Sequence, residues 1–213
     1  MATTTSSWWQ QGTMDKRERQ VGHTKRMISP DHWARYSFAA THLTHRDLVL
    51  DALCGCGYGA YILAGTKPRL VEAFDISRDA ITYAERWWYD NRIIYRVMAA
   101  EHFDYPEAHF SFVTCFEAIE HIDGPIGLLA SINYSMRENG KLFVSTPNEL
   151  KVPWSQKCFP FHKRHYTPQQ LEEMLGQCGF EVEAWFSQSD KQHGRFFHDG
   201  TNGNVLVALA RKQ

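Results

Sequence analysis

An apolar run that ends in an acid and then breaks into a glycine-rich loop constrains this chain more than any other feature. Residues 48–59 read Leu-Val-Leu-Asp-Ala-Leu-Cys-Gly-Cys-Gly-Tyr-Gly, with glycines at 55, 57 and 59. The apolar run predicts a buried β-strand. Glycines let backbone N–H groups approach a ligand closely, because no Cβ intervenes. The segment therefore predicts a ligand-binding loop at the end of a strand.

The spacing of the glycines separates two classes of ligand. A dinucleotide fingerprint is G-x-G-x-x-G, whereas here the third glycine comes one residue early and Asp51 precedes the loop. A carboxylate repels a phosphate but attracts an ammonium or a sulfonium. The loop therefore favours a cationic nucleoside that carries an amino acid, and it disfavours a nicotinamide oxidoreductase.

Length and charge narrow the class of protein. With 213 residues, 43% of them hydrophobic, we expect one α/β domain over residues 29–213 after a flexible segment over 1–28. A net charge of −1 gives no overall field that would attract nucleic acid or anionic lipid. No apolar run reaches the roughly 20 residues that span a bilayer, so we expect a cytoplasmic protein with no membrane partner. Composition favours no oligomeric state.

The cysteines predict no disulfide framework. Their number, five, is odd, and Cys54 and Cys56 lie inside the glycine loop. We interpret both as small residues that fill the loop rather than as metal ligands.

Strand-like and helix-like segments alternate along the chain. A helix is expected to begin at Ser29-Pro30-Asp31, and Ser77 and Thr167 are typical N-caps of two later helices. Alternation of this kind predicts a mainly parallel sheet covered on both faces. The last two strand-like runs have no helix between them, which predicts an antiparallel hairpin at the end of the chain. The expected strands cover 48–53, 69–76, 93–98, 112–117, 141–145, 181–187 and 204–211.

Acids and histidines follow several of the predicted strands. In an open parallel sheet the ligand lies beyond the carboxyl ends of the strands, so these residues are candidates for a site. Asp75 ends the second strand about twenty residues after the glycines, where a carboxylate accepts both hydroxyls of a ribose. Its alternative role is a helix cap. Ala100 and Glu101 follow the third strand, and the segment Glu117-Ala118-Ile119-Glu120-His121 follows the fourth.

Together these segments resemble the class I S-adenosylmethionine-dependent methyltransferases over residues 31–211. The most similar subgroup has an Arg-Tyr helix, here Arg35-Tyr36, a Cys-Gly-x-Gly-Tyr-Gly loop and a Glu-x-x-Glu-His segment. Two later motifs of that subgroup are Ser145-Thr146-Pro147-Asn148 and Pro160-Phe161-His162. The resemblance implies a Rossmann-like, seven-stranded, mostly parallel sheet with a C-terminal antiparallel hairpin and helices on both faces.

The resemblance also implies which residues hold the cofactor, S-adenosyl-L-methionine. Arg35 and Tyr36 would reach its methionine carboxylate. The remaining implied contacts are Asp51, Gly55 and Gly57 for the methionine part, Asp75 for the ribose, and Ala100 and Glu101 for the adenine, with Cys56, Ile76 and Glu117 as further cofactor-binding residues. The sequence departs from the subgroup at Phe159, where asparagine is usual, and at His165, where glutamate often stands. Both departures concern the methyl acceptor.

Methyl transfer from a sulfonium needs alignment and a dry pocket more than a protein nucleophile. If the acceptor is a hydroxyl, a base must take its proton, and His121 is the leading candidate because imidazole titrates near working pH. His162 and His165 are the alternatives. The other interpretation of His121 is a neutral histidine that ties the fourth strand to a neighbouring loop.

The Glu-x-x-Glu-His segment also resembles the metal set of small-RNA 2′-O-methyltransferases, and it recurs in ubiquinone-pathway O-methyltransferases. On one helical turn Glu117, Glu120 and His121 would face a single ion, Mg²⁺ or a similar oxygen-preferring cation, with His162 as fourth ligand. The alternative is that Glu120 caps a turn and no metal binds.

Residues 149–166 form a long connection rich in aromatic and basic side chains, and long connections at this edge are usually lids or substrate walls. We therefore predict O-methylation of a small-molecule acceptor such as a sugar, a nucleotide-sugar or a phenol. One alternative is a metal-assisted nucleotide or RNA-end methyltransferase, with nucleic acid as partner. Another is a protein that binds the cofactor but uses it in a different reaction.

Overall fold

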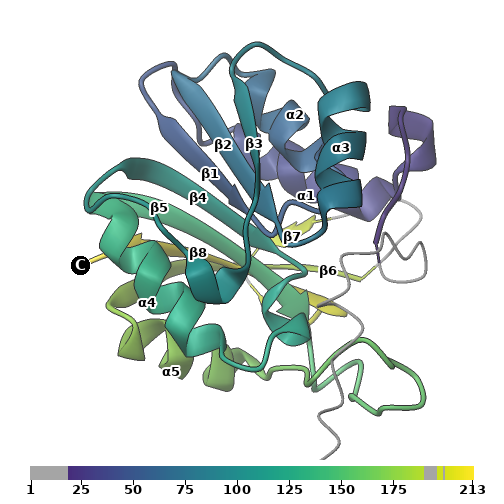
Figure 1. Ribbon diagram of the computed structural model, residues 1–213. Helices are drawn as coiled ribbons and strands as arrows, with labels where there is room; N and C mark the ends of the chain where they lie inside the picture. Colours follow the sequence, from purple (N-terminus) through teal and green to yellow (C-terminus); the bar gives the residue numbers. More distant parts are fainter. Residues whose placement is uncertain (1–18, 190–195, 199) are drawn as a thin grey trace, which may run out of the picture.

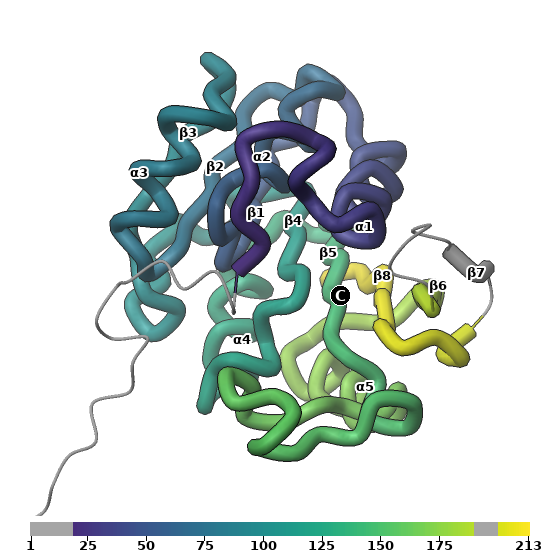
Figure 2. The backbone as a smooth tube through the Cα atoms, turned by 90° about the vertical axis from the view of Figure 1, so that its right-hand side faces the viewer, coloured from purple at the N-terminus to yellow at the C-terminus, as the bar shows by residue number. Residues whose placement is uncertain are grey.

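The computed structural model describes residues 19–189, 196–198 and 200–213. Most of the segment expected to be flexible, residues 1–18, lies outside the described residues. Its remainder packs on the domain: the indole N–H of Trp88 donates to the carbonyl of Gly22 at 2.8 Å. The side chain of Gln20 accepts the backbone N–H of Ser29 at 3.1 Å. Figure 2 shows this purple segment crossing the molecule before α1.

Helices and strands alternate as the sequence predicts. In chain order they are η2 (Lys25–Met27), α1 (Pro30–Ala40), β1 (Leu48–Ala52), α2 (Tyr58–Ala64), β2 (Leu70–Asp75), α3 (Arg78–Trp87), β3 (Ile93–Val97), η3 (Ala100–His102), β4 (Phe110–Phe116), η4 (Ile119–His121), α4 (Pro125–Ser135), β5 (Met136–Pro147), α5 (Pro168–Gln177), β6 (Phe180–Gln188), β7 (Phe196–His198) and β8 (Val205–Lys212). None of the helices in the described residues is long and apolar enough to cross a membrane.

The strands form one sheet in the order β3-β2-β1-β4-β5-β8-β6-β7. The strands from β3 to β5 are parallel, whereas β8 runs antiparallel to both β5 and β6, which confirms the predicted C-terminal hairpin. The sheet has an eighth strand beyond the seven expected, because the short β7 pairs with β6 at the edge. A run of three residues is too short to show the alternation that reveals a strand in sequence.

Two hydrophobic cores lie on the two faces of the sheet. One contains the apolar residues of α4 and α5, and the other those of α1, α2 and α3. Figure 1 shows these two groups of helices on opposite sides of the sheet. The connection from β3 to β4, residues 98–109, is long enough for a crossover helix. It contains only the 3-10 turn η3, and all of its residues are described.

The predicted helix caps are present. The Ser77 hydroxyl accepts the N–H of Ala80 at 3.2 Å, and Thr167 with Gln170 forms a full capping box at the start of α5. Such caps satisfy helix N–H groups that have no partner within the helix.

The glycine loop is shaped largely by the protein's own packing. Gly57 has φ of 86°, and a Cβ there would lie 2.4 Å from the Cβ of Ala84 on α3. A Cβ on Gly59 would lie 2.1 Å from the ring of Tyr36 on α1. Gly59, the third glycine of the motif, is therefore needed to make room for the ring of Tyr36 and not for a ligand.

We therefore expect Gly59→Ala to lower the free energy of unfolding by about 1–3 kcal/mol, the usual cost of overpacking. In a chain of this size that corresponds to roughly 2–4 °C in Tm for each kcal/mol. Gly176→Ala makes the same chemical change within α5, where a Cβ has nothing within 4 Å. Thermal unfolding of both variants tests the idea, which fails if Gly59→Ala is as stable as Gly176→Ala.

Candidate active site

A cavity of about 550 Å³ lies beyond the carboxyl ends of β1, β2 and β4. Because β1 and β4 are neighbours whose chains leave in opposite directions, this is the switch point where open α/β sheets bind ligands. The volume falls in the usual range for a small-molecule site. Helix α1, the segment before it and the connection 149–166 complete the wall.

Asp75 lines one end of the cavity. Its carboxylate accepts the N–H of Gly55 at 3.0 Å and that of Ser77 at 2.9 Å, and it pairs with Arg19 at 3.2 Å. Gly55 has φ of 55°, in the left-handed region that favours glycine. It lines the cavity, and a Cβ there would meet nothing within 4 Å. Four further predicted cofactor residues also line the cavity, namely Cys56, Ile76, Ala100 and Glu101.

The sequence predicts that Asp51 faces the methionine part of the cofactor. In the structure Asp51 lies behind the cavity wall and does not line the cavity. Its side chain is fully buried and accepts the hydroxyls of Thr114 at 2.7 Å and Tyr36 at 2.9 Å. Burial raises the pKa of Asp51 to about 7, although both hydrogen bonds act to lower it. Gly57 is also absent from the wall, whereas Tyr36 contributes to it.

Arg35 is held in a buried polar cluster beside the cavity and does not line it. Its Nε donates to Gln188 at 2.8 Å, and its terminal nitrogens lie 3.4 Å from Glu117 and 3.9 Å from Asp31. Neither terminal nitrogen makes a hydrogen bond among the described residues. Glu117 does line the cavity, with φ of 47° and one oxygen that accepts the Ser145 hydroxyl at 2.8 Å.

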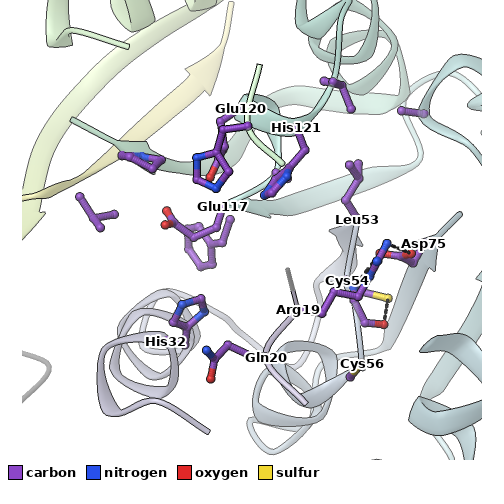
Figure 3. A pocket seen from close by; sticks show the side chains of 18 of the residues that line it. Arg19, Gln20, His32, Leu53, Cys54, Cys56, Asp75, Glu117, Glu120 and His121 are labelled. Carbon is purple, nitrogen blue, oxygen red and sulfur yellow. Dashed lines mark hydrogen bonds and ion pairs between the residues drawn. The ribbon is translucent and has the colours of Figure 1, made fainter. Parts of the chain in front are cut away.

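Glu120, His121 and His162 meet at the other end of the cavity. Each offers a ligand atom, and these atoms lie within 4.8 Å of one another. Figure 3 shows the Glu120 and His121 side chains on the same side of the cavity, across from His32. Glu120 is fully buried, and neither of its oxygens has a hydrogen-bond partner among the described residues. Burial, followed by the nearby charge of Glu117, raises its pKa well above the usual value.

Both histidines of this group are neutral, and their proton positions follow from their partners. Nδ1 of His121 lies 3.2 Å from the carbonyl of Phe161, so this nitrogen carries the proton and Nε2 does not. Burial lowers the pKa of His121 and of His162 to about 4, and in each case a neighbouring imidazole lowers it further. His165 does not line the cavity, but its Nε2 lies 2.8 Å from Nδ1 of His162.

This donor set fits a divalent cation. A buried carboxylate with unsatisfied oxygens costs free energy unless a cation or proton compensates it, and unprotonated imidazole nitrogens are metal ligands. Two imidazoles with one carboxylate suit Mn²⁺, Fe²⁺, Co²⁺ or Zn²⁺ better than Mg²⁺, which prefers oxygen. Glu117 is not among the grouped ligands, because its carboxylate faces Ser145 and Arg35.

Sequence reasoning assigned no role to several residues of the wall. His32 on α1 lines the cavity with its Nδ1 2.9 Å from the hydroxyl of Tyr58, and Gln20 and Asn204 line it from segments distant in sequence. The only signal for His32 was its position three residues before Arg35, close to one turn of the same helix. Nothing in the local sequence of Asn204 marked it.

Comparison with known proteins identifies the family. A family model described as a methyltransferase domain matches residues 22–184, so the chain belongs to that family. A Mycolicibacterium smegmatis protein, named a probable S-adenosylmethionine-dependent methyltransferase, is 30% identical over 79% of this chain and 70% of its own. The ubiquinone biosynthesis O-methyltransferase of Thiobacillus denitrificans is 29% identical over 77% of this chain and 78% of its own.

Solved structures show the same fold. An S-adenosylmethionine-dependent methyltransferase from Mesorhizobium loti matches with a TM-score of 0.69 at 16% identity, over 84% of this chain and 98% of that one. The [4+2]-cyclase SpnF matches with a TM-score of 0.70 at 16% identity, over 85% and 80%. The protein is therefore a class I methyltransferase with a Rossmann-like sheet, and its methyl donor is S-adenosylmethionine.

The raised pKa of Asp51 makes a prediction about stability. Between its ordinary value of 3.8 and about 7, the folded protein keeps a proton that the unfolded chain has released. The contribution of this group is therefore fully present below pH 3.8 and is lost as the pH rises towards 7. Asp51→Asn cannot titrate, so its stability relative to the unsubstituted protein should increase across this window, by up to roughly 1.4 kcal/mol per pH unit.

Urea unfolding at several pH values measures this difference. Asp104→Asn makes the same carboxyl-to-amide change at an exposed position and serves as the control. A difference for Asp51→Asn that does not change with pH would contradict the assignment.

Proposed function

We propose that this enzyme transfers the methyl group of S-adenosylmethionine to a hydroxyl oxygen of a small acceptor, with a divalent cation bound by Glu120, His121 and His162. The observation that carries the proposal is the buried, unpartnered carboxylate of Glu120 beside two neutral imidazoles at the end of the cavity opposite Asp75. The likeness to ubiquinone biosynthesis O-methyltransferases supports a hydroxyl acceptor.

The cofactor would extend from Asp75 towards Glu117. Asp75 would accept the ribose hydroxyls, and the adenine would lie against Ile76, Ala100 and Glu101, which form the adjoining wall. Glu117, a carboxylate of the wall, is better placed than Asp51 to face the cationic methionine part. The terminal N–H groups of Arg35, which form an ion pair with Glu117 but no hydrogen bond among the described residues, would balance that charge and favour a carboxylate nearby.

The residues of the cavity would act mainly by alignment. Methyl transfer is an in-line displacement, so the rate depends on holding the acceptor oxygen about 3 Å from the methyl carbon in a site without water. When bound, the cation would lower the pKa of the acceptor hydroxyl and orient its oxygen. Val152 and Phe159 of the connection 149–166 line the same end of the cavity as His162 and would select the acceptor's shape.

This proposal gives His121 a different role from the general base that the sequence suggests. The hydrogen bond from Nδ1 to the carbonyl of Phe161 orients Nε2, which is the arrangement typical of histidine ligands. A base would need the same unprotonated nitrogen, so one group cannot do both at once. Dependence of turnover on a cation distinguishes the two roles.

We expect Glu120→Gln to remove most cation binding while the protein stays folded. Because the amide has nearly the same shape and carries no buried charge, Tm should be unchanged or higher. Glu138→Gln is the matched control, since Glu138 is exposed at the start of β5, at the opposite end of the sheet. Titration calorimetry with Mn²⁺, Co²⁺ and Zn²⁺ measures binding, and S-adenosylhomocysteine formation on a panel of phenols, sugars and nucleotide-sugars measures turnover.

Two outcomes would overturn the cation proposal. One is equal cation affinity in Glu120→Gln and the unsubstituted protein. The other is turnover that survives chelation yet disappears in His121→Ala, which would restore the general base. A steep loss of acceptor affinity with salt would point to phosphate contacts and hence to a nucleotide or nucleic-acid acceptor.

The cofactor assignment has its own test. Asp75→Asn should weaken S-adenosylhomocysteine binding roughly 10- to 100-fold, because the amide cannot accept both ribose hydroxyls as a carboxylate does. Asp79→Asn, at an exposed position on α3, should leave the Kd unchanged. Equal Kd values for the two variants would remove Asp75 from the ribose site.

A further inference from the structure

We propose that His165 is a positioning residue that fixes the proton of His162 on Nδ1 and so keeps Nε2 of His162 available as a ligand. The proposal rests on the proposed function for its consequence, a competent cation site. Its structural part, the choice of tautomer, concerns the chain alone and can be tested without a cation. The sequence offered His165 as an alternative to His121 for the base, but it does not line the cavity.

The proton positions follow from one fixed acceptor. Nδ1 of His165 lies 2.6 Å from the carbonyl oxygen of Val152, and a carbonyl can only accept, so Nδ1 carries a proton. In the neutral ring Nε2 then has a lone pair and accepts. Its partner, 2.8 Å away, is Nδ1 of His162, which must therefore donate. The lone pair of His162 is left on Nε2.

The other tautomer of His162 would be unfavourable. With the proton on Nε2, the lone pair of Nδ1 would face the lone pair of His165 at 2.8 Å, and a buried hydrogen bond would be lost. The His165 side chain is fully buried, so water has no access to replace that bond. The carbonyl of Val152 thus determines, through two rings, which nitrogen of His162 can bind a cation.

Packing keeps the two rings in this arrangement. The ring of Phe159 stacks on His162 at 5.3 Å and meets His165 edge-on at 4.5 Å. The indole N–H of Trp154 donates to the carbonyl of His162 at 3.1 Å. Next to His165, Tyr166 pairs with Asn148 in an isolated β-bridge that fastens this part of the connection to the end of β5.

Two variants distinguish a residue that fixes the His162 tautomer from one that only fills space in the connection. His165→Ala removes the acceptor, whereas His165→Gln keeps an oxygen that can accept the Nδ1 proton of His162. Long-range ¹H–¹⁵N NMR spectra distinguish protonated from unprotonated ring nitrogens, and the His162 signals are identified by their loss in His162→Ala. We expect the Nδ1–H form in the unsubstituted protein and in His165→Gln, and a shift towards the Nε2–H form in His165→Ala.

Cation affinity provides the second measurement. With Co²⁺ as the probe, His165→Ala should bind roughly 10- to 100-fold more weakly, as is usual when the partner of a ligating histidine is lost. The Co²⁺ affinity of His165→Gln should stay near that of the unsubstituted protein. The affinity for S-adenosylhomocysteine and the Tm should be unchanged in both variants, which would show that the rest of the site is intact.

The outcomes distinguish this proposal from the proposed function. If His162 keeps its tautomer in His165→Ala, or if Gln and Ala behave alike, positioning by His165 is wrong. If the tautomer changes as expected but the unsubstituted protein binds no Co²⁺, Mn²⁺ or Zn²⁺, the positioning is correct and the cation role in the proposed function is wrong.

Discussion

The contact between Tyr36 and the glycine loop determines how the proposed cofactor end of the cavity is built. The Tyr36 ring occupies the space where Gly59 has no side chain, and its hydroxyl reaches the buried Asp51. Helix α1, strand β1 and helix α2 are thereby held at one point. Arg35, the residue before Tyr36 on α1, is directed towards Glu117, which follows β4, and towards Gln188 at the end of β6. One aromatic side chain therefore aligns the glycine loop with the charged cluster beside it.

Burial divides the acids at this edge of the sheet into two kinds. Asp75 has backbone N–H groups and Arg19 as partners, and Glu117 has Ser145 and Arg35. Asp51 and Glu120 are fully buried without a cationic partner among the described residues, and burial raises the pKa of each. Two hydroxyls donate to one oxygen of Asp51, whose other oxygen has no hydrogen-bond partner, whereas neither oxygen of Glu120 has one among the described residues. The fold therefore accommodates the first acid structurally, and the second is explained best by a ligand.

The sequence predicted what depends on local pattern. The alternation of strands and helices, the caps at Ser77 and Thr167, and the final hairpin follow from periodicity and short-range hydrogen bonding, and the structure confirms them. Strand ends were less accurate: β5, expected over 141–145, covers Met136–Pro147. The depth of Asp51 could not be read from sequence, because it depends on Tyr36 and Thr114, which approach only after folding. His32 and Asn204 reach the cavity for the same reason: their roles arise from tertiary proximity, which leaves no local signature.

The two ends of the cavity are constructed differently, and this explains why the fold alone does not define the reaction. The proposed cofactor end rises from strand ends and the glycine loop, and a protein named a [4+2]-cyclase has the same fold, so the fold by itself does not define the chemistry. The other end combines η4 with the connection 149–166. Two hydrogen bonds join these segments: the Lys163 N–H donates to the carbonyl of Glu120 at 2.7 Å, and His121 donates to the carbonyl of Phe161. Because the connection carries both His162, the proposed ligand, and the wall residue Phe159, a change in its sequence would alter the proposed acceptor selectivity and cation binding together.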